Sequence, residues 1–254
     1  MQKITIAVAS HKPYWMPQNA MYMPVQVGAL GKQSLGWQRD DAGEHISQKN
    51  ATFCELTALY WLWKNIDADM YGLAHYRRYL AAGCPFVSKR KQMLSEAQAE
   101  RLLARTDVLL PKKRHYWIET NESQYVHAHN AQDLIQTRKT LAMLYPAYLP
   151  AWDAVMQRRS GHRFNMFIMR KTLFQPYCAW LFSILFQVEK DLDISHYATK
   201  DQRVFGYLSE RLLDVWLLHH QVRYQEVRVV HLETQRWGNK IVNFLKRKFT
   251  YQRQ

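Results

Sequence analysis

The stretch MYGLAHYRRYL, residues 70–80, decides how this chain is expected to fold and where its chemistry should lie. Residues 70–74 are apolar or small, which predicts a short buried strand, and the run His75-Tyr76-Arg77-Arg78 follows directly. In an open parallel sheet, ligands bind outside the carboxyl ends of the strands, because helix N-termini and variable loops meet there. We therefore expect the histidine and the two arginines at the functional edge of a sheet.

Asp67 and Asp69 precede the same strand with the Asp-x-Asp spacing of carboxylate pairs that hold a divalent metal. They fall between a predicted helix ending near Lys64 and the strand starting near Met70, so they lie at the amino end of the strand, away from the expected site. We interpret their spacing as a coincidence.

The pair Arg77-Arg78, with His75 and Tyr76 beside it, has the chemistry of an anion-binding group. Guanidinium forks match phosphate oxygens with two parallel hydrogen bonds, and histidine or tyrosine can donate more. A solvated face or a salt-bridged corner is the alternative interpretation.

Composition predicts a well-packed soluble chain with an anionic partner. Of 254 residues, 48% are apolar and 13% aromatic, which excludes a disordered protein, and one domain is favoured over two. The formal net charge of +14 points to nucleic acid, a nucleotide diphosphate or an acidic membrane face. Three scattered cysteines indicate neither a disulfide framework nor a structural zinc, and favour a reducing cytosol. We expect no signal peptide and no spanning helix.

Strands and helices are expected to alternate along the chain. Strands are predicted at 4–9, 70–74, 107–111, 164–169 and 222–230, and helices at 52–64, 95–105, 131–144, 152–159, 173–189 and 201–219. Capping boxes at Thr52–Glu55 and Ser95–Gln98 would open two of the helices, and residues 13–50 are expected to form a long functional loop. This order predicts a single-domain α/β fold with a mostly parallel central sheet flanked by helices.

Two further segments hold candidate binding residues. In residues 39–50, Lys49 and a helix N-terminus could attract phosphate, while Asp40 or Asp41 could accept from a ribose hydroxyl or a base; an ordinary polar loop is the alternative. His127 and His129 have metal-like spacing, but the sequence offers no identifiable third ligand.

The C-terminal segment, residues 238–254, is basic and amphipathic. Such a segment is typical of a chain that lies on anionic lipid, and a helix docked on the domain is the alternative. Residues 1–237 would then form the folded domain.

Several long motifs in one order resemble a known family of bacterial glycosyltransferases of capsule, exopolysaccharide and O-antigen synthesis, catalogued as domain of unknown function 4422. The motifs are VASHKPYWMP, RDDAGEHISQKNATFCELTALYWLWKN, GLAHYRRYL, LLPKKRHYWIET, NMFIMRK and RVFGYLSERLLDVW, and they cover nearly the whole chain. The resemblance implies a GT-A-like, Rossmann-like fold and a cytoplasmic enzyme, peripheral at the inner membrane. It implies transfer of a sugar from a nucleotide-diphosphate donor, first of all UDP-galactofuranose and otherwise another UDP-hexose, to a lipid-linked glycan.

The resemblance also implies roles for individual residues. His11, Asp40, Asp41, Lys49, Asn50, Arg77 and Arg78 would bind the donor, with His75 at the diphosphate, and Asn165 and Arg203 would face the reacting sugars, with His127 and His129 as further candidates on the acceptor side. For a base that takes the acceptor proton, Glu210 is the first candidate and Asp201 the second. No Asp-x-Asp follows a strand, so the need for a divalent metal (Mn or Mg) stays open, and no metal ligands are assigned.

Two other function classes remain as alternatives. The charge would suit a basic nucleic-acid-binding module, although the sequence shows no RNA-recognition, helix-turn-helix or zinc-finger pattern. The many Trp and Tyr residues would suit a non-catalytic carbohydrate-binding protein.

Overall fold

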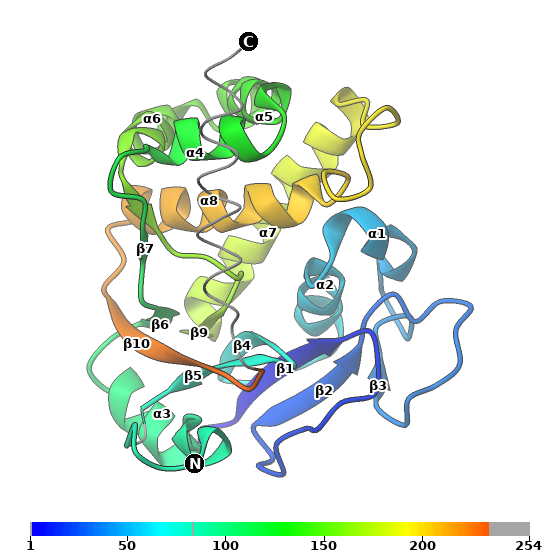
Figure 1. Ribbon diagram of the computed structural model, residues 1–254, viewed down its shortest axis with the longest axis vertical. Helices are drawn as coiled ribbons and strands as arrows, with labels where there is room; N and C mark the ends of the chain where they lie inside the picture. Colours follow the sequence, from blue (N-terminus) through cyan, green and yellow to red (C-terminus); the bar gives the residue numbers. More distant parts are fainter. Residues whose placement is uncertain (1, 83, 234–254) are drawn as a thin grey trace.

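The computed structural model describes residues 2–82 and 84–233 (Figure 1). The strands are β1 Ile4–Ser10, β2 Tyr22–Gln26, β3 Gln38–Arg39, β4 Met70–His75, β5 Arg78–Ala81, β6 Val108–Pro111, β7 Arg114–His115, β8 Ser160–Gly161, β9 Phe167–Arg170 and β10 Tyr224–His231. The α-helices are α1 Asn50–Phe53, α2 Leu56–Asn65, α3 Glu96–Leu103, α4 Asn121–Ala128, α5 Ala131–Leu144, α6 Leu149–Gln157, α7 Lys171–Asp191 and α8 Val204–His219.

The main sheet is mixed, and part of it closes on itself. Its strands run in the order β3-β2-β1-β4-β5-β10-β6-β9, and β9 also pairs with β4, so that β4, β5, β10, β6 and β9 form a ring of five strands. Within this ring only β10 and β6 are parallel, and the other four pairings are antiparallel. The parallel pairings outside it join β3, β2, β1 and β4. The predicted mostly parallel, GT-A-like or Rossmann-like sheet is therefore wrong.

The physical reason for this error lies in the stretch on which the prediction depended. β4 does not lead into a crossover: His75 pairs with Arg78 across a tight turn, so β5 returns antiparallel beside β4. A two-residue connection can join only antiparallel strands, whereas parallel pairing needs a crossover of a dozen or more residues. The sequence Arg-Tyr-Leu-Ala of β5 was not recognised as a strand, so the alternation of strands and helices looked purely parallel.

Helices form two layers on one face of the sheet. α2 and α7 pack on it, with Tyr71 of β4 stacked on Phe174 of α7 at 4.1 Å between ring centres. α5 packs on α7 and α6 on α8, so α4, α5 and α6 form an outer layer farther from the sheet (Figure 1). α3 lies against the other face, beside β6.

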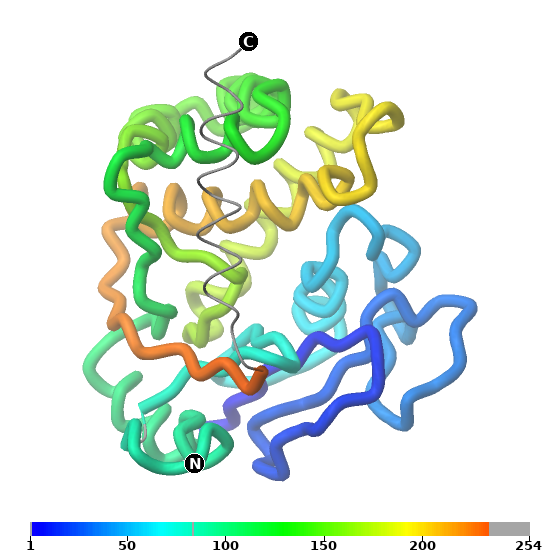
Figure 2. The backbone as a smooth tube through the Cα atoms, viewed as in Figure 1, coloured from blue at the N-terminus to red at the C-terminus, as the bar shows by residue number. Residues whose placement is uncertain are grey.

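Most predicted elements are confirmed, with shifted ends. The capping box of Ser95 and Gln98 is present at α3, whereas the expected helix over residues 52–64 is broken at Cys54, and no such box forms between Thr52 and Glu55. The segment 13–50 contains β2 and β3 and makes a wide excursion at the edge of the molecule (Figure 2). The expected C-terminal lipid-binding segment, 238–254, lies outside the described residues. Among the described helices, none has the length and apolar character needed to cross a bilayer.

Candidate functional site

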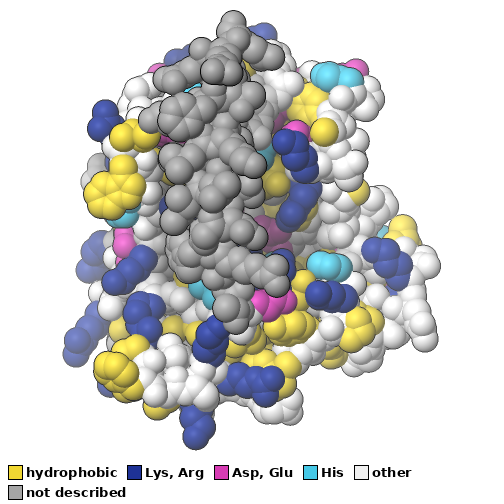
Figure 3. Space-filling model, viewed as in Figure 1, with side chains coloured by type: hydrophobic (Ala, Val, Ile, Leu, Met, Phe, Trp, Pro, Cys, Tyr) yellow, Lys and Arg dark blue, Asp and Glu magenta, His cyan; other side chains and the backbone are white. Residues whose placement is uncertain are grey.

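A cleft lies between the ends of β1 and β4 and the start of α8. It consists of two adjoining cavities of about 290 and 210 Å³, which share Cys54, Glu55, His75, Arg77 and Arg203. In Figure 3, cationic, acidic and histidine side chains gather between the helical layers and the sheet. We call this site the cationic cleft; its remaining polar wall residues are His11, Asn50, Arg78, Tyr207 and Glu210.

The β4–β5 turn supplies the floor of the cleft. Burial, together with the nearby Arg78 and Arg77 charges, lowers the pKa of His75 to about 3, so its imidazole is neutral at physiological pH. The backbone N–H of Arg77 donates to Nδ1 of His75 at 3.4 Å, which assigns the ring proton to Nε2. His75 is therefore a neutral hydrogen-bond donor in this cleft.

Arg77 is held in place but keeps hydrogen-bonding capacity. Its guanidinium lies 5.0 Å from the ring centre of Tyr76, and Nη1 is 3.1 Å from Oε2 of Glu233. Its Nε is buried and has no hydrogen-bond partner among the described residues. Buried donors are nearly always hydrogen-bonded, so this atom is an exception among the described residues.

Two more guanidinium groups line the same cleft. Arg78 lies 4.6 Å from the ring centre of Phe164, and Arg203, which directly precedes α8, donates from Nε to Sγ of Cys54 at 3.0 Å. Burial raises the pKa of Cys54 to about 11, so the thiol stays protonated. The walls thus combine three permanent positive charges with a neutral imidazole.

A carboxylate faces these cations from the break between α1 and α2. Oε1 of Glu55 accepts a hydrogen bond from Nδ2 of Asn165 at 2.8 Å, and burial raises the pKa of Glu55. The Asn165 amide is fixed in turn, since Nδ2 also donates to the Gly206 carbonyl at 3.0 Å and Oδ1 accepts from the Ser209 hydroxyl at 2.6 Å.

The backbone around this carboxylate is held in an unfavourable conformation. Cys54, Phe164 and Asn165 have φ values of 54°, 80° and 53°, in the left-handed region that side chains other than glycine rarely adopt. Each such residue costs on the order of 1–3 kcal/mol and persists only when its surroundings enforce it, most often at a functional site.

Glu210 is the second carboxylate of the cleft, and it already has partners. Its Oε1 accepts from the backbone N–H of Phe164 at 2.8 Å, and its Oε2 lies 3.8 Å from nitrogen atoms of both Arg163 and Arg211.

The structure brings together more than half of the site residues predicted from the sequence. His11, Asn50, His75, Arg77, Arg78, Arg203 and Glu210 line the cationic cleft, and Asn165 lies directly behind it. Their assigned roles at donor and acceptor stay predictions.

The other nominated residues have protein partners elsewhere. Asp40 is buried and accepts from the backbone of Gly28 and Ala29 and from the Ser47 hydroxyl. Asp41 pairs with Arg39, Lys49 with Glu189, His127 with Glu119, and His129 with Asp201. His129 also stacks on Tyr207 at 4.1 Å, so the His129–Asp201 pair lies behind that wall residue. Within the described part of the chain, no group of three His, Cys, Asp or Glu side chains is arranged to hold a metal ion.

Sequence reasoning missed Glu55, Cys54 and Tyr207. Glu55 was assigned to a helix cap, and the local sequence offers no sign of the left-handed Cys54 that turns this carboxylate toward the cleft. The sequence does place an acidic residue directly after a cysteine at the start of an apolar helix. However, this pattern fits a helix-capping glutamate as well as a functional one.

The chain as a whole is similar to a known structure and to a known family. A solved apo structure of the WbbM bifunctional glycosyltransferase matches with a TM-score of 0.85 and 30% sequence identity, over 91% of this chain and 46% of the WbbM chain. The present chain thus spans about half the length of that protein, and the likeness supports a glycosyltransferase-related role. No curated protein matches the chain. The model of the family described as domain of unknown function DUF4422 matches residues 5–221, most of the chain, so this protein belongs to the DUF4422 family.

Proposed function

We propose that this protein is a glycosyltransferase that takes a sugar from a nucleotide-diphosphate donor bound in the cationic cleft. UDP-galactofuranose is the first candidate donor and another UDP-hexose the second. The acceptor would be a lipid-linked glycan of capsule, exopolysaccharide or O-antigen synthesis, at the cytoplasmic face of the inner membrane. The likeness to one part of WbbM and the family resemblance support this proposal.

One observation carries the proposal: Arg77, Arg78 and Arg203 converge on one cleft. A leaving nucleotide diphosphate gains negative charge as the bond to the sugar breaks. Donors already fixed around it lower the barrier, because no solvent must reorganise during the step. The neutral His75 would donate from Nε2 to the same diphosphate.

The carboxylates would handle the acceptor proton. The acceptor oxygen forms a bond to the anomeric carbon, the bond from that carbon to the diphosphate oxygen breaks, and the hydroxyl proton moves to a carboxylate. Glu55 fits this role better than Glu210, because burial raises its pKa toward the operating range while Glu210 already accepts from the Phe164 backbone and lies near two guanidinium groups. Asp201 is paired with His129 and lines neither cavity.

Calorimetric titration with UDP tests the donor site. The parent protein should bind UDP, and Arg77→Gln should weaken binding by roughly 10- to 100-fold, as expected for a lost charge-assisted hydrogen bond. Arg138→Gln is the matched control, because Arg138 forms an exposed ion pair with Asp153 outside the cleft. Equal UDP affinity in the parent and Arg77→Gln would contradict the diphosphate role.

Turnover and binding measurements with other ligands separate the other function classes. Release of UDP from UDP-galactofuranose would support a transferase. Binding to generic DNA that weakens steeply with salt, without affinity for any nucleotide sugar, would instead favour a nucleic-acid-binding module. Glycan binding without turnover of any donor would favour a carbohydrate-binding protein.

A further inference from the structure

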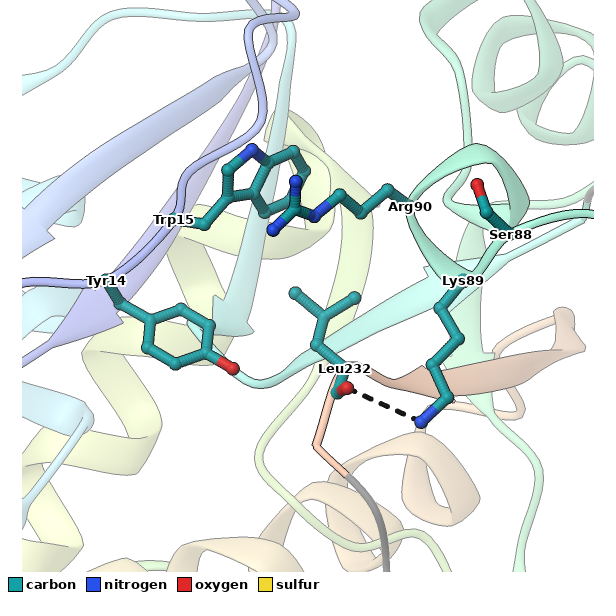
Figure 4. A pocket seen from close by; sticks show the side chains of 6 residues that line it. All are labelled: Tyr14, Trp15, Ser88, Lys89, Arg90 and Leu232. Atoms are coloured by element: carbon teal, nitrogen blue, oxygen red, sulfur yellow. Dashed lines mark hydrogen bonds between the residues drawn. The ribbon is translucent and has the colours of Figure 1, made fainter.

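A third cavity, of about 710 Å³, opens beside the cationic cleft. It is lined by Tyr14, Trp15, Ser88, Lys89, Arg90 and Leu232, and we call it the Trp15 cavity (Figure 4). Tyr14 and Trp15 come from the segment after β1, and the other side is formed by residues that precede α3 and by Leu232, which directly follows β10. Its volume is within the range of small-molecule sites.

The wall chemistry of the Trp15 cavity suits an anionic ligand with a ring to stack. The Arg90 guanidinium lies 4.4 Å from the ring centre of Trp15, which orients this planar cation without neutralising it. Among the described residues, Lys89 donates to the backbone carbonyls of Leu232 and Glu233, both at the long distance of 3.4 Å (Figure 4 draws the first). Within residues 2–82 and 84–233, neither cation forms an ion pair with a carboxylate.

Aromatic and hydroxyl groups also line the Trp15 cavity. The Tyr14 hydroxyl points toward Leu232, and Ser88 lies at the edge of the cavity with its hydroxyl directed away from the other five side chains (Figure 4). Tyrosine and tryptophan combine an apolar face with a polar edge, which matches the alternation of C–H faces and hydroxyl groups on a sugar ring.

Two chains of contacts connect the Trp15 cavity to the cationic cleft. The ring of Tyr14 contacts the ring of Tyr76 edge-on, with 4.9 Å between ring centres. His75 in turn stacks on Tyr76, with 4.4 Å between ring centres. Glu233 pairs with Arg77 through its carboxylate, while its carbonyl accepts from Lys89. The two sites are therefore separated by about one layer of side chains, which one extended ligand, or two adjacent ligands, could bridge.

We propose that the Trp15 cavity binds an anionic saccharide, with a sugar ring against Trp15 and Tyr14 and its phosphate or carboxylate held by Lys89 and Arg90. The further assignment of this cavity as the acceptor subsite of a transferase rests on the proposed function. The binding of an anionic saccharide does not depend on that function.

Isothermal titration calorimetry on the full chain, with excess UDP present to occupy the cationic cleft, tests the proposal. The probes are lactose 1-phosphate, 3′-sialyllactose, neutral lactose and inorganic phosphate. Lactose 1-phosphate or 3′-sialyllactose should bind at least about tenfold more tightly than lactose and than phosphate alone, because only they offer both a ring and a charge. The stronger of the two identifies the anion as a phosphate or a carboxylate.

Two variants locate the binding. Arg90→Gln and Trp15→Ala should each weaken binding of the anionic probe about tenfold, while Arg138→Gln should leave its affinity unchanged. Because Arg90 is exposed, Arg90→Gln is expected to fold even if Trp15→Ala does not. Unchanged affinity in Arg90→Gln, or equal affinities for lactose 1-phosphate and phosphate, would overturn the proposal. Probe binding that depends on Arg90 in a protein with no affinity for UDP would uphold this site and contradict the proposed donor site instead.

Discussion

Asn165 donates its side-chain amide to Glu55 at 2.8 Å, which joins two segments 110 residues apart at the back of the cationic cleft. The amide is itself fixed by Ser209 and by the Gly206 carbonyl of α8. Glu55 thus has one oriented hydrogen bond and a half-buried position opposite three guanidinium groups, the arrangement expected of a carboxylate that must receive a proton.

Glu55→Gln should abolish sugar transfer while preserving the cleft. Glutamine has the same shape and can still accept from Asn165, but it cannot take a proton, so UDP release from the donor should fall by at least about a hundredfold with UDP affinity nearly unchanged. Steady-state kinetics and calorimetry measure the two quantities. Activity above one tenth of the parent value would exclude Glu55 as the base.

The same substitution should alter how stability depends on pH. Burial raises the pKa of Glu55 in the folded state, so its favourable contribution is complete below the ordinary glutamate pKa and is lost as pH rises through the folded-state value. Glu55→Gln has no proton to lose. Its free energy of unfolding should therefore increase relative to the parent as pH rises through this window and stay level above it, as urea titrations at several pH values would show; a variant whose free energy of unfolding falls relative to the parent as pH rises would refute this.

Replacing Asn165 separates backbone strain from the amide contacts. With φ at 53°, Asn165→Gly removes the side-chain hydrogen bonds and also the strain of a Cβ in the left-handed region, whereas Asn165→Ala removes the hydrogen bonds and keeps that Cβ, at a relative cost of about 1–2 kcal/mol. Chemical denaturation should thus show the alanine variant to be less stable than both the parent and the glycine variant. Both should lose activity, since Glu55 loses its oriented partner; full activity in the glycine variant would mean that the amide does not position the carboxylate.

The sequence could predict the cations of the site but not the carboxylate that faces them. His75, Arg77 and Arg78 follow a buried apolar run, so their position at a strand end is a local property that the sequence shows directly. Glu55 reaches the cleft only because Cys54 adopts a left-handed backbone and Asn165 holds the carboxylate, both of which depend on distant parts of the chain.

The sheet was mispredicted for a related reason. Pairing of β9 with β4 and of β10 with β5 joins segments nearly a hundred or more residues apart, and strand direction follows from that pairing rather than from local periodicity. Helix signals are local, and the range 131–144 matches α5 at both ends. However, α4 was not predicted, and the predicted helix over 52–64 is broken at Cys54.

Asp40 offers a test of a residue that the resemblance assigned to the donor. Its two oxygens accept from Gly28, Ala29 and Ser47, so Asp40→Asn would turn an amide donor toward an N–H or O–H group and should destabilise the fold by about 1–3 kcal/mol. Asp153→Asn, in an exposed pair, is the control. Urea unfolding measures the change. If the folded variant lost UDP affinity at unchanged stability, Asp40 would contact the donor rather than support the loop.

Asp201→Asn distinguishes the remaining candidate for the base. Oδ1 of Asp201 lies 3.2 Å from Nδ1 of His129, and the His129 ring stacks on Tyr207. The rings of His129 and Tyr207 therefore lie between the Asp201 carboxylate and the cleft. Burial lowers the pKa of His129 even though Asp201 favours its charged form, so the pair is expected to be a carboxylate beside a neutral imidazole. Loss of such a partly exposed contact should change turnover by no more than about threefold. The measurement is the rate of UDP release, compared between the parent, Asp201→Asn and Glu55→Gln. If Asp201→Asn were as inactive as Glu55→Gln, Asp201 would be a candidate for the base that accepts the proton.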